Sequence, residues 1–165
     1  MRKKAIQRAG SRQSQGQLTT LIINQCKQYP APRSLLLRIL FSAYCDFKQE
    51  PATVNLLLVN DQDMKKFNQE YKGRSDSTDV LAFDDHEIDP VTKILHLGEI
   101  IVSVDTARCQ ASLRHMRIRD EVTLYALHGL LHLLGMRDGT TCEQQAMMQK
   151  QSEIFLQYGL NLTYE

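Results

Sequence analysis

Apolar residues follow two periods along this chain, and the two periods predict where strands and helices lie. Short runs rich in Leu, Ile and Val that are bounded by polar or turn residues predict strands. We expect four such strands, at residues 18–26, 52–60, 80–83 and 94–104. Apolar residues spaced three and four apart predict helices. We expect five of these, at residues 34–47, 61–73, 105–116, 119–134 and 142–159.

Capping residues and apolar faces refine this pattern. Asn60 or Asp61 is expected to cap the N-terminus of the second helix, and Asp105 that of the third. The fourth helix, residues 119–134, is apolar nearly all round, which predicts a central and buried position. Gly135 is expected to end it. Together the elements predict an α+β fold, a small and mostly four-stranded sheet packed against about five helices.

The length and composition agree with one folded domain. The 165 residues are 42% hydrophobic and 24% charged, which provides for a core and excludes a disordered or low-complexity chain. We assign residues 18–165 to a single domain and residues 1–17 to a basic flexible tail. No apolar run approaches the roughly 18 residues that span a bilayer, so no membrane is expected as a partner. The four cysteines form no CxxC pair and indicate reduced thiols.

Positive charge is concentrated at the start of the chain, although the net charge is only +1. Residues 1–45 hold eight basic side chains and no acidic one, because Asp46 is the first acid. This distribution favours an anionic partner. Residues 1–16 are rich in Arg, Ser and Gln, as organellar transit peptides and short bacterial tails both are. We expect a cytoplasmic protein, with organellar import as the alternative.

The candidate chemistry lies at the end of the fourth helix. His128 and His132 are four residues apart, so both imidazoles lie on one face of the helix, one turn apart. Gly135 allows the chain to turn back, which brings Asp138 to a third corner. Two imidazole nitrogens, one carboxylate oxygen and an open fourth position are typical of catalytic zinc. The alternative is a pair of structural histidines in a buried helix; the following Gly and acid favour one Zn²⁺ per chain.

The residue after the first histidine bears on the kind of reaction. A zinc peptidase of the H-E-x-x-H type has a Glu there as its general base, whereas this chain has Gly129. A glycine inside a helix costs about 1 kcal/mol relative to Ala. We expect one of two reasons for a glycine at position 129. Either backbone or substrate approaches the helix closely there, or the helix packs tightly against a neighbour. In both cases the peptidase base is missing.

The segment ALHGLLHLLGMRD, residues 126–138, resembles the signature of the YbeY endoribonuclease family, whose motif reads H-G-x-L-H-L-x-G-Y-D-H. Similar segments lie at residues 68–83 and 97–111 and in the last helix, and the resemblance spans about residues 18–158. It implies an α+β fold with a zinc site in a cleft. It also implies a single-strand-specific, metal-dependent endoribonuclease that acts in ribosomal RNA processing, in 16S rRNA 3′ end maturation and in ribosome quality control.

The resemblance implies particular partners and site residues. The expected partners are single-stranded or ribosomal RNA and the small ribosomal subunit, with its platform protein and the GTPase Era; no DNA is expected. The implied metal ligands are His128, His132 and Asp138, and the implied catalytic residues are Lys72, Arg74 and His128. Lys72 and Arg74 would hold the phosphate and offset charge in the transition state. Their alternative is a solvated helix end, where cations are favoured anyway.

Several residues depart from the family pattern. Asp138 stands at the usual third His, with Arg137 at the preceding Asp, and Glu99 replaces a common Asp. A carboxylate is a competent oxygen ligand, so the site survives this change. Lys72 stands at a usual Arg and binds phosphate as a point charge rather than bidentately.

Two other functions stay open at the level of sequence. One is a zinc metallopeptidase-like hydrolase that shares the helix motif, against which the missing Glu speaks. The other is a non-catalytic ribosome-assembly factor whose metal only holds the fold. The assembly factor differs from the endoribonuclease in one observable, because alanine at His132 would then leave ribosome binding intact and matter only through stability.

Overall fold

The computed structural model describes residues 17–48 and 50–162, so residues 1–16 of the expected basic tail lie outside the described residues. Strands and helices follow one another within this part of the chain, with every expected element present. Their order is β1 (Leu18–Asn24), α1 (Arg33–Phe47), β2 (Ala52–Val59), α2 (Asp61–Lys72), β3 (Val80–Ile88), β4 (Leu95–Ser103), α3 (Val104–Leu113), α4 (Ile118–Leu133) and α5 (Thr141–Leu156). The predicted α+β fold with four strands and five helices is confirmed.

The four strands form one mixed sheet in the order β1-β2-β4-β3. β1 and β2 are parallel, as are β2 and β4, while β3 runs antiparallel to β4 at the edge. The parallel pairs require crossover connections, which α1 supplies between β1 and β2. β3 is therefore an edge strand of this sheet, paired with β4 on one side.

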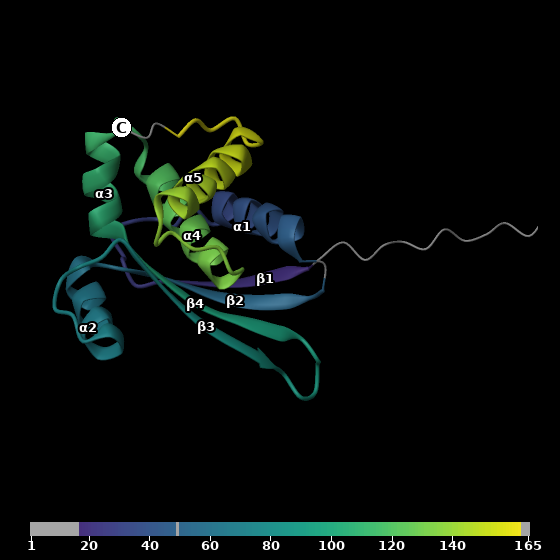
Figure 1. Ribbon diagram of the computed structural model, residues 1–165. Helices are drawn as coiled ribbons and strands as arrows, with labels where there is room; N and C mark the ends of the chain where they lie inside the picture. Colours follow the sequence, from purple (N-terminus) through teal and green to yellow (C-terminus); the bar gives the residue numbers. More distant parts are fainter. Residues whose placement is uncertain (1–16, 49, 163–165) are drawn as a thin grey trace, which may run out of the picture.

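The helices cover the two faces of the sheet unequally. α1, α4 and α5 lie over one face, and α2 lies on the other (Figure 1). The main core fills the space beneath the first group, where Leu36, Leu56, Ile100 and Leu127 are buried. A smaller apolar cluster packs between the opposite face and α2, formed by Val59, Met64, Leu81 and Ile101. Among the residues that the structure describes, no helix is both long and apolar enough to cross a membrane.

α4 is the central helix, as its sequence predicts. It packs against α1, α3 and α5 and lies on β3 and β4. From Asp120 to Leu133 every residue of α4 is buried except His128 and His132. Over this stretch a buried helix therefore presents the two imidazoles to a partly open space.

Two local expectations were wrong, and both errors have a physical cause. The third strand is longer than the expected 80–83, because β3 continues to Ile88 through exposed polar residues. Pairing with β4 requires backbone hydrogen bonds rather than burial, so the hydrophobic pattern does not mark it. The cap of α3 is Ser103, whose hydroxyl accepts from the Thr106 N–H at 3.1 Å. Asp105 instead accepts from the Asp61 N–H at the start of α2.

Candidate metal centre

The two histidines of α4 are aligned by the helix itself. Their Nε2 atoms lie 2.9 Å apart, and the rings meet edge to face with centroids separated by 4.5 Å. This is the arrangement expected of residues four apart on one helical face. Both side chains are about one-quarter exposed, 24% for His128 and 27% for His132, so they lie at the boundary between the core and an opening.

The turn after α4 returns the chain to this pair. Gly135 adopts a φ of +98°, which a residue with a side chain rarely adopts. The Met136 N–H then donates to the Leu131 carbonyl at 2.9 Å, which holds the turn against the helix end. Asp138 follows, with Oδ2 at 3.4 Å from His128 Nε2 and 3.5 Å from His132 Nε2. The structure thus brings together the three expected metal ligands.

These distances fit a metal ion. A tetrahedral ion with bonds of about 2.0–2.1 Å holds its ligand atoms about 3.3 Å apart. The three separations here are 2.9, 3.4 and 3.5 Å, between His128, His132 and Asp138. The set contains two nitrogen donors and one oxygen donor from this chain. A three-ligand set of this kind leaves a fourth position open to water or substrate.

Neighbouring groups orient the ring of His132 and lower the pKa of His128. His132 Nδ1–H donates to the Met136 carbonyl at 3.0 Å, which leaves the lone pair on Nε2 facing the other two ligand atoms. Burial, followed by the nearby His132 ring, lowers the pKa of His128 below its usual value. A histidine must be neutral to bind a metal, so the lowered pKa of His128 favours ligation, while the hydrogen bond of His132 favours it by orienting the ring.

The side-chain amide of Gln151 on α5 meets the outer nitrogen of His128. Its Nε2 lies 3.0 Å from His128 Nδ1, and Gln151 is only 4% exposed. An amide carries both donor and acceptor atoms, so it can pair with Nδ1 in either tautomer of the imidazole. Such outer partners fix the orientation of a ligating histidine. The sequence carries no signal for this residue, since it is one of several glutamines on a polar helix and lies 23 positions from His128.

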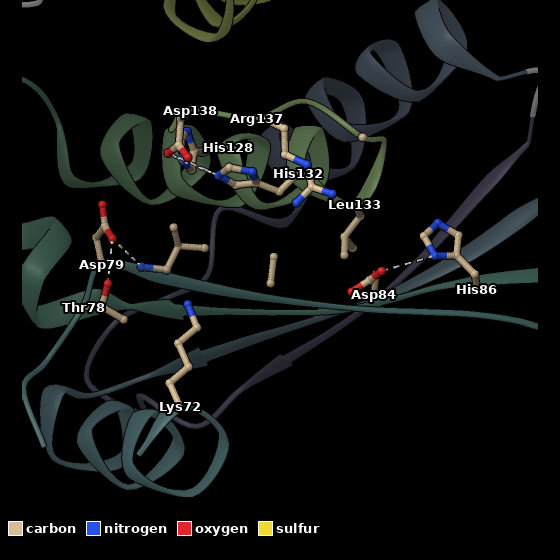
Figure 2. A pocket seen from close by; sticks show the side chains of 13 residues that line it. Lys72, Thr78, Asp79, Asp84, His86, His128, His132, Leu133, Arg137 and Asp138 are labelled. Carbon is tan, nitrogen blue, oxygen red and sulfur yellow. Dashed lines mark hydrogen bonds and ion pairs between the residues drawn. The ribbon is translucent and has the colours of Figure 1, made fainter. Parts of the chain in front are cut away.

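A cleft of about 520 Å³ opens beside the three ligand atoms. β3 forms one wall with every second residue, because alternate strand residues share a face. The residues in question are Val80, Ala82, Asp84 and His86. Figure 2 shows the histidine pair and Asp138 at one end of this space, Lys72 across from them, and Asp84 beside His86 at the other end.

The structure separates the two expected phosphate-binding residues. Lys72, at the C-terminal end of α2, lines the cleft. Arg74 is not among the residues that line it; its guanidinium pairs with the Asp76 carboxylate at 3.2 Å and is 68% exposed. Thr78 and Asp79, between α2 and β3, also line the cleft. Arg74 as a phosphate contact stays a prediction.

Gly129 is explained by packing against the sheet. A Cβ added there would lie 2.6 Å from Ile100 Cγ2 and 3.2 Å from Val80 Cγ2. The absence of a side chain lets α4 lie close to β3 and β4, so tight packing is the reason for this glycine. The same geometry turns position 129 toward the sheet, so this position provides no general base for the cleft.

Fold and site together define a class of protein, an α+β domain with a candidate metal centre of two histidines and one aspartate at the end of its central helix. The model of the family described as Endoribonuclease YbeY matches residues 24–159. The chain belongs to the YbeY endoribonuclease family, as the resemblance of its histidine motif implies.

Individual relatives agree with this assignment. The chain is 38% identical over 112 residues to Endoribonuclease YbeY of Synechococcus sp., covering 64% of this chain and 69% of that protein. It is 35% identical over 127 residues to Endoribonuclease YbeY of Bacillus subtilis, covering 73% and 81%. The solution structure of TM1509 from Thermotoga maritima has a similar fold, with a TM-score of 0.58, 23% identity, and coverage of 86% of this chain and 92% of that one.

Proposed function

We propose that this protein is a zinc-dependent endoribonuclease that cleaves single-stranded ribosomal RNA, with 16S rRNA 3′ end maturation and ribosome quality control as its roles. The observation that carries this proposal is the set of three ligand atoms from His128, His132 and Asp138 at the end of an open cleft. Family membership supplies the kind of substrate, since its relatives are named endoribonucleases.

A zinc ion held by these three residues would supply a bound water of lowered pKa and polarise a phosphoryl oxygen. The chain's own residues contribute the rest. Hydrolysis joins a water oxygen to phosphorus, breaks one P–O bond to a ribose oxygen, and leaves a proton on that oxygen. Lys72 faces the cleft and would offset negative charge on the phosphate. The Met136 carbonyl and the Gln151 amide hold the two imidazoles in place.

The packing of Gly129 disfavours the peptidase alternative. In H-E-x-x-H peptidases the Glu after the first histidine is the general base. Here that position lies against Ile100 and Val80 of the sheet, with no space for a side chain. A phosphodiester carries a negative charge that Lys72 in the cleft can offset, so it agrees better with this cleft than a peptide substrate does.

The partners that we propose for the protein follow from its proposed RNA substrate. We propose the small ribosomal subunit as the site of action, with its platform protein and the GTPase Era as neighbours, and the cytoplasm as the location. DNA is not proposed as a substrate.

Cleavage of RNA oligonucleotides tests the proposal. We would incubate the full chain, loaded with one equivalent of zinc, with a single-stranded ribosomal RNA oligonucleotide, with the same sequence as a duplex, and with a peptide panel. His132→Ala removes one ligand, and we expect its single-turnover rate to fall by about two orders of magnitude or more. His115→Asn is the matched control, because His115 is exposed, lies outside the cleft and has a φ of +53° that Asn tolerates.

The outcomes separate the three functions. Cleavage of the single strand by wild type and His115→Asn, and its loss in His132→Ala, would support the nuclease. Cleavage of peptides but not RNA would replace it with a hydrolase of another class. No cleavage of either, together with ribosome binding that survives His132→Ala, would make the protein a non-catalytic assembly factor.

A further inference from the structure

The cleft contains a second cation that the sequence did not assign to the site. Arg137 lies in the turn after α4, one residue before Asp138, and lines the cleft together with Lys72. Figure 2 shows its guanidinium reaching into the space beside His132, on the wall opposite Lys72. One cation therefore comes from the end of α2 and the other from the turn that carries a metal ligand.

The backbone on both sides of Arg137 is fixed by hydrogen bonds. The carbonyl of Met136 accepts from His132 Nδ1 at 3.0 Å, and the carbonyl of Asp138 accepts from the Gln144 amide at 3.0 Å. The Met136 N–H is bound to Leu131. The position from which the Arg137 side chain starts is therefore held in place before any substrate arrives.

The guanidinium itself stays available. Among the residues that the structure describes, no carboxylate oxygen forms an ion pair with the guanidinium of Arg137 or the ammonium of Lys72, whereas Arg74 pairs with Asp76 and Arg114 pairs with the buried Glu121. Arg137 is exposed. A fixed backbone with a free, solvent-facing guanidinium is suited to binding an anion rather than to stabilising the fold.

The lining of the cleft indicates which part of RNA it would contact. Of the described residues that line it, none is Phe, Tyr or Trp, the large rings that form stacking platforms for single-stranded bases in other proteins. Its cations match phosphates instead, and phosphate contacts carry no base sequence. A guanidinium presents a planar pair of donors that fits two phosphate oxygens, while an ammonium acts as a point charge.

From these observations we infer that Arg137 is a substrate-binding residue. Its guanidinium binds an RNA phosphate beside the metal centre through two hydrogen bonds, and Lys72 contacts the same phosphate from the opposite wall of the cleft. The inference rests on the proposed function for the identity of the anion. It also gives the chain a guanidinium in the cleft, where the expected Arg74 does not lie.

Binding without cleavage tests this inference separately. We would measure the affinity of a 2′-O-methyl, nuclease-resistant, single-stranded oligonucleotide across a series of salt concentrations, for wild type, Arg137→Ala, Arg137→Lys and Arg108→Ala. Arg108 is the matched control, an exposed arginine of α3 outside the cleft. Zinc content is measured for each variant, because Arg137 adjoins a ligand.

We expect Arg137→Ala to bind about tenfold more weakly and to lower the salt slope by about 0.7, the value for one phosphate contact on a single strand. Arg137→Lys should keep the slope, because it keeps the charge, but should cleave the unmodified RNA oligonucleotide more slowly in a separate assay, because it loses the bidentate contact. Arg108→Ala should match wild type. Unchanged affinity and slope in Arg137→Ala would overturn the inference, and so would loss of zinc in that variant.

The inference and the proposed function fail differently. If wild type cleaves RNA and Arg137→Ala cleaves it equally well with an unchanged slope, the nuclease stands and the role of Arg137 is refuted. If wild type cleaves no RNA but Arg137→Ala still loses affinity and slope, the phosphate contact stands and the nuclease proposal fails.

Discussion

Replacing Gln151 should weaken metal binding although this residue touches no metal. Gln151 is buried on α5, and its amide nitrogen lies 3.0 Å from Nδ1 of His128. Gln151→Leu keeps nearly the same volume, so the core stays filled, but it removes the group that pairs with this nitrogen. Because His128 is only 24% exposed, water replaces the amide poorly.

The size of the effect follows from this contact. Loss of an outer partner of a ligating histidine costs about 10–100-fold in metal affinity. That range corresponds to about 1.4–2.7 kcal/mol of binding free energy. Gln151→Glu places a carboxylate at the same position, and a carboxylate accepts strongly from Nδ1–H of a metal-bound imidazole. We therefore expect Gln151→Glu to bind zinc at least as tightly as wild type.

Competition with a chromophoric zinc chelator at pH 7 measures these affinities. Gln149→Leu is the matched control, because Gln149 lies on the same helix but is exposed. Thermal unfolding of the metal-free proteins separates a loss of affinity from a loss of fold. A Gln151→Leu protein that folds normally and binds zinc within about twofold of wild type would refute the assigned role of Gln151.

Two further predictions concern the stability of the fold around the site. Gly129→Ala should lower the free energy of unfolding by about 1 kcal/mol, since crowding Ile100 at 2.6 Å outweighs the gain in helix propensity; urea unfolding measures this, and an increase in stability would contradict it. Asp61 accepts hydrogen bonds from the hydroxyls of Ser77, Ser103 and Thr106, which lower its pKa although burial acts to raise it. Its contribution is therefore present above the usual pKa of an aspartate and lost as pH falls through the lowered one, so Asp61→Asn should cost about 2 kcal/mol at pH 7 and less at pH 2–3. Unfolding curves across that pH range check the sign, and an equal loss at both ends would contradict it.

The elements of the fold follow closely from local sequence. Apolar spacing and capping residues together locate the five helices, and Asn60 caps α2 as expected, with its side chain accepting from the Asp63 N–H. The errors arise where long-range contacts decide the structure. β3 extends through charged residues because β4 pairs with them, and Asp105 turns from its own helix to the start of α2.

The candidate site likewise contains residues that the local sequence predicts and residues whose role depends on long-range contacts. His128 and His132 are fixed by helical periodicity, and Gly135 with its positive φ brings Asp138 back to them. Gln151 and Arg137 could not be assigned from the sequence, because their part in the site depends on how α5 packs on α4 and on which way a turn faces. Likewise, only the contact of Gly129 with the sheet distinguishes packing from substrate approach.

The metal content of the purified protein tests the assigned metal site most directly. We would purify wild type, Asp138→Ala and Asp138→His without chelator and determine bound transition metals by elemental analysis at pH 7 and pH 5.5. The donor set of His128, His132 and Asp138 predicts about one equivalent of zinc in wild type and in Asp138→His, and a large loss in Asp138→Ala. Asp138→His should release its metal at a higher pH on acidification, because a histidine ligand must be neutral. No metal in wild type, or equal metal in wild type and Asp138→Ala, would contradict the site.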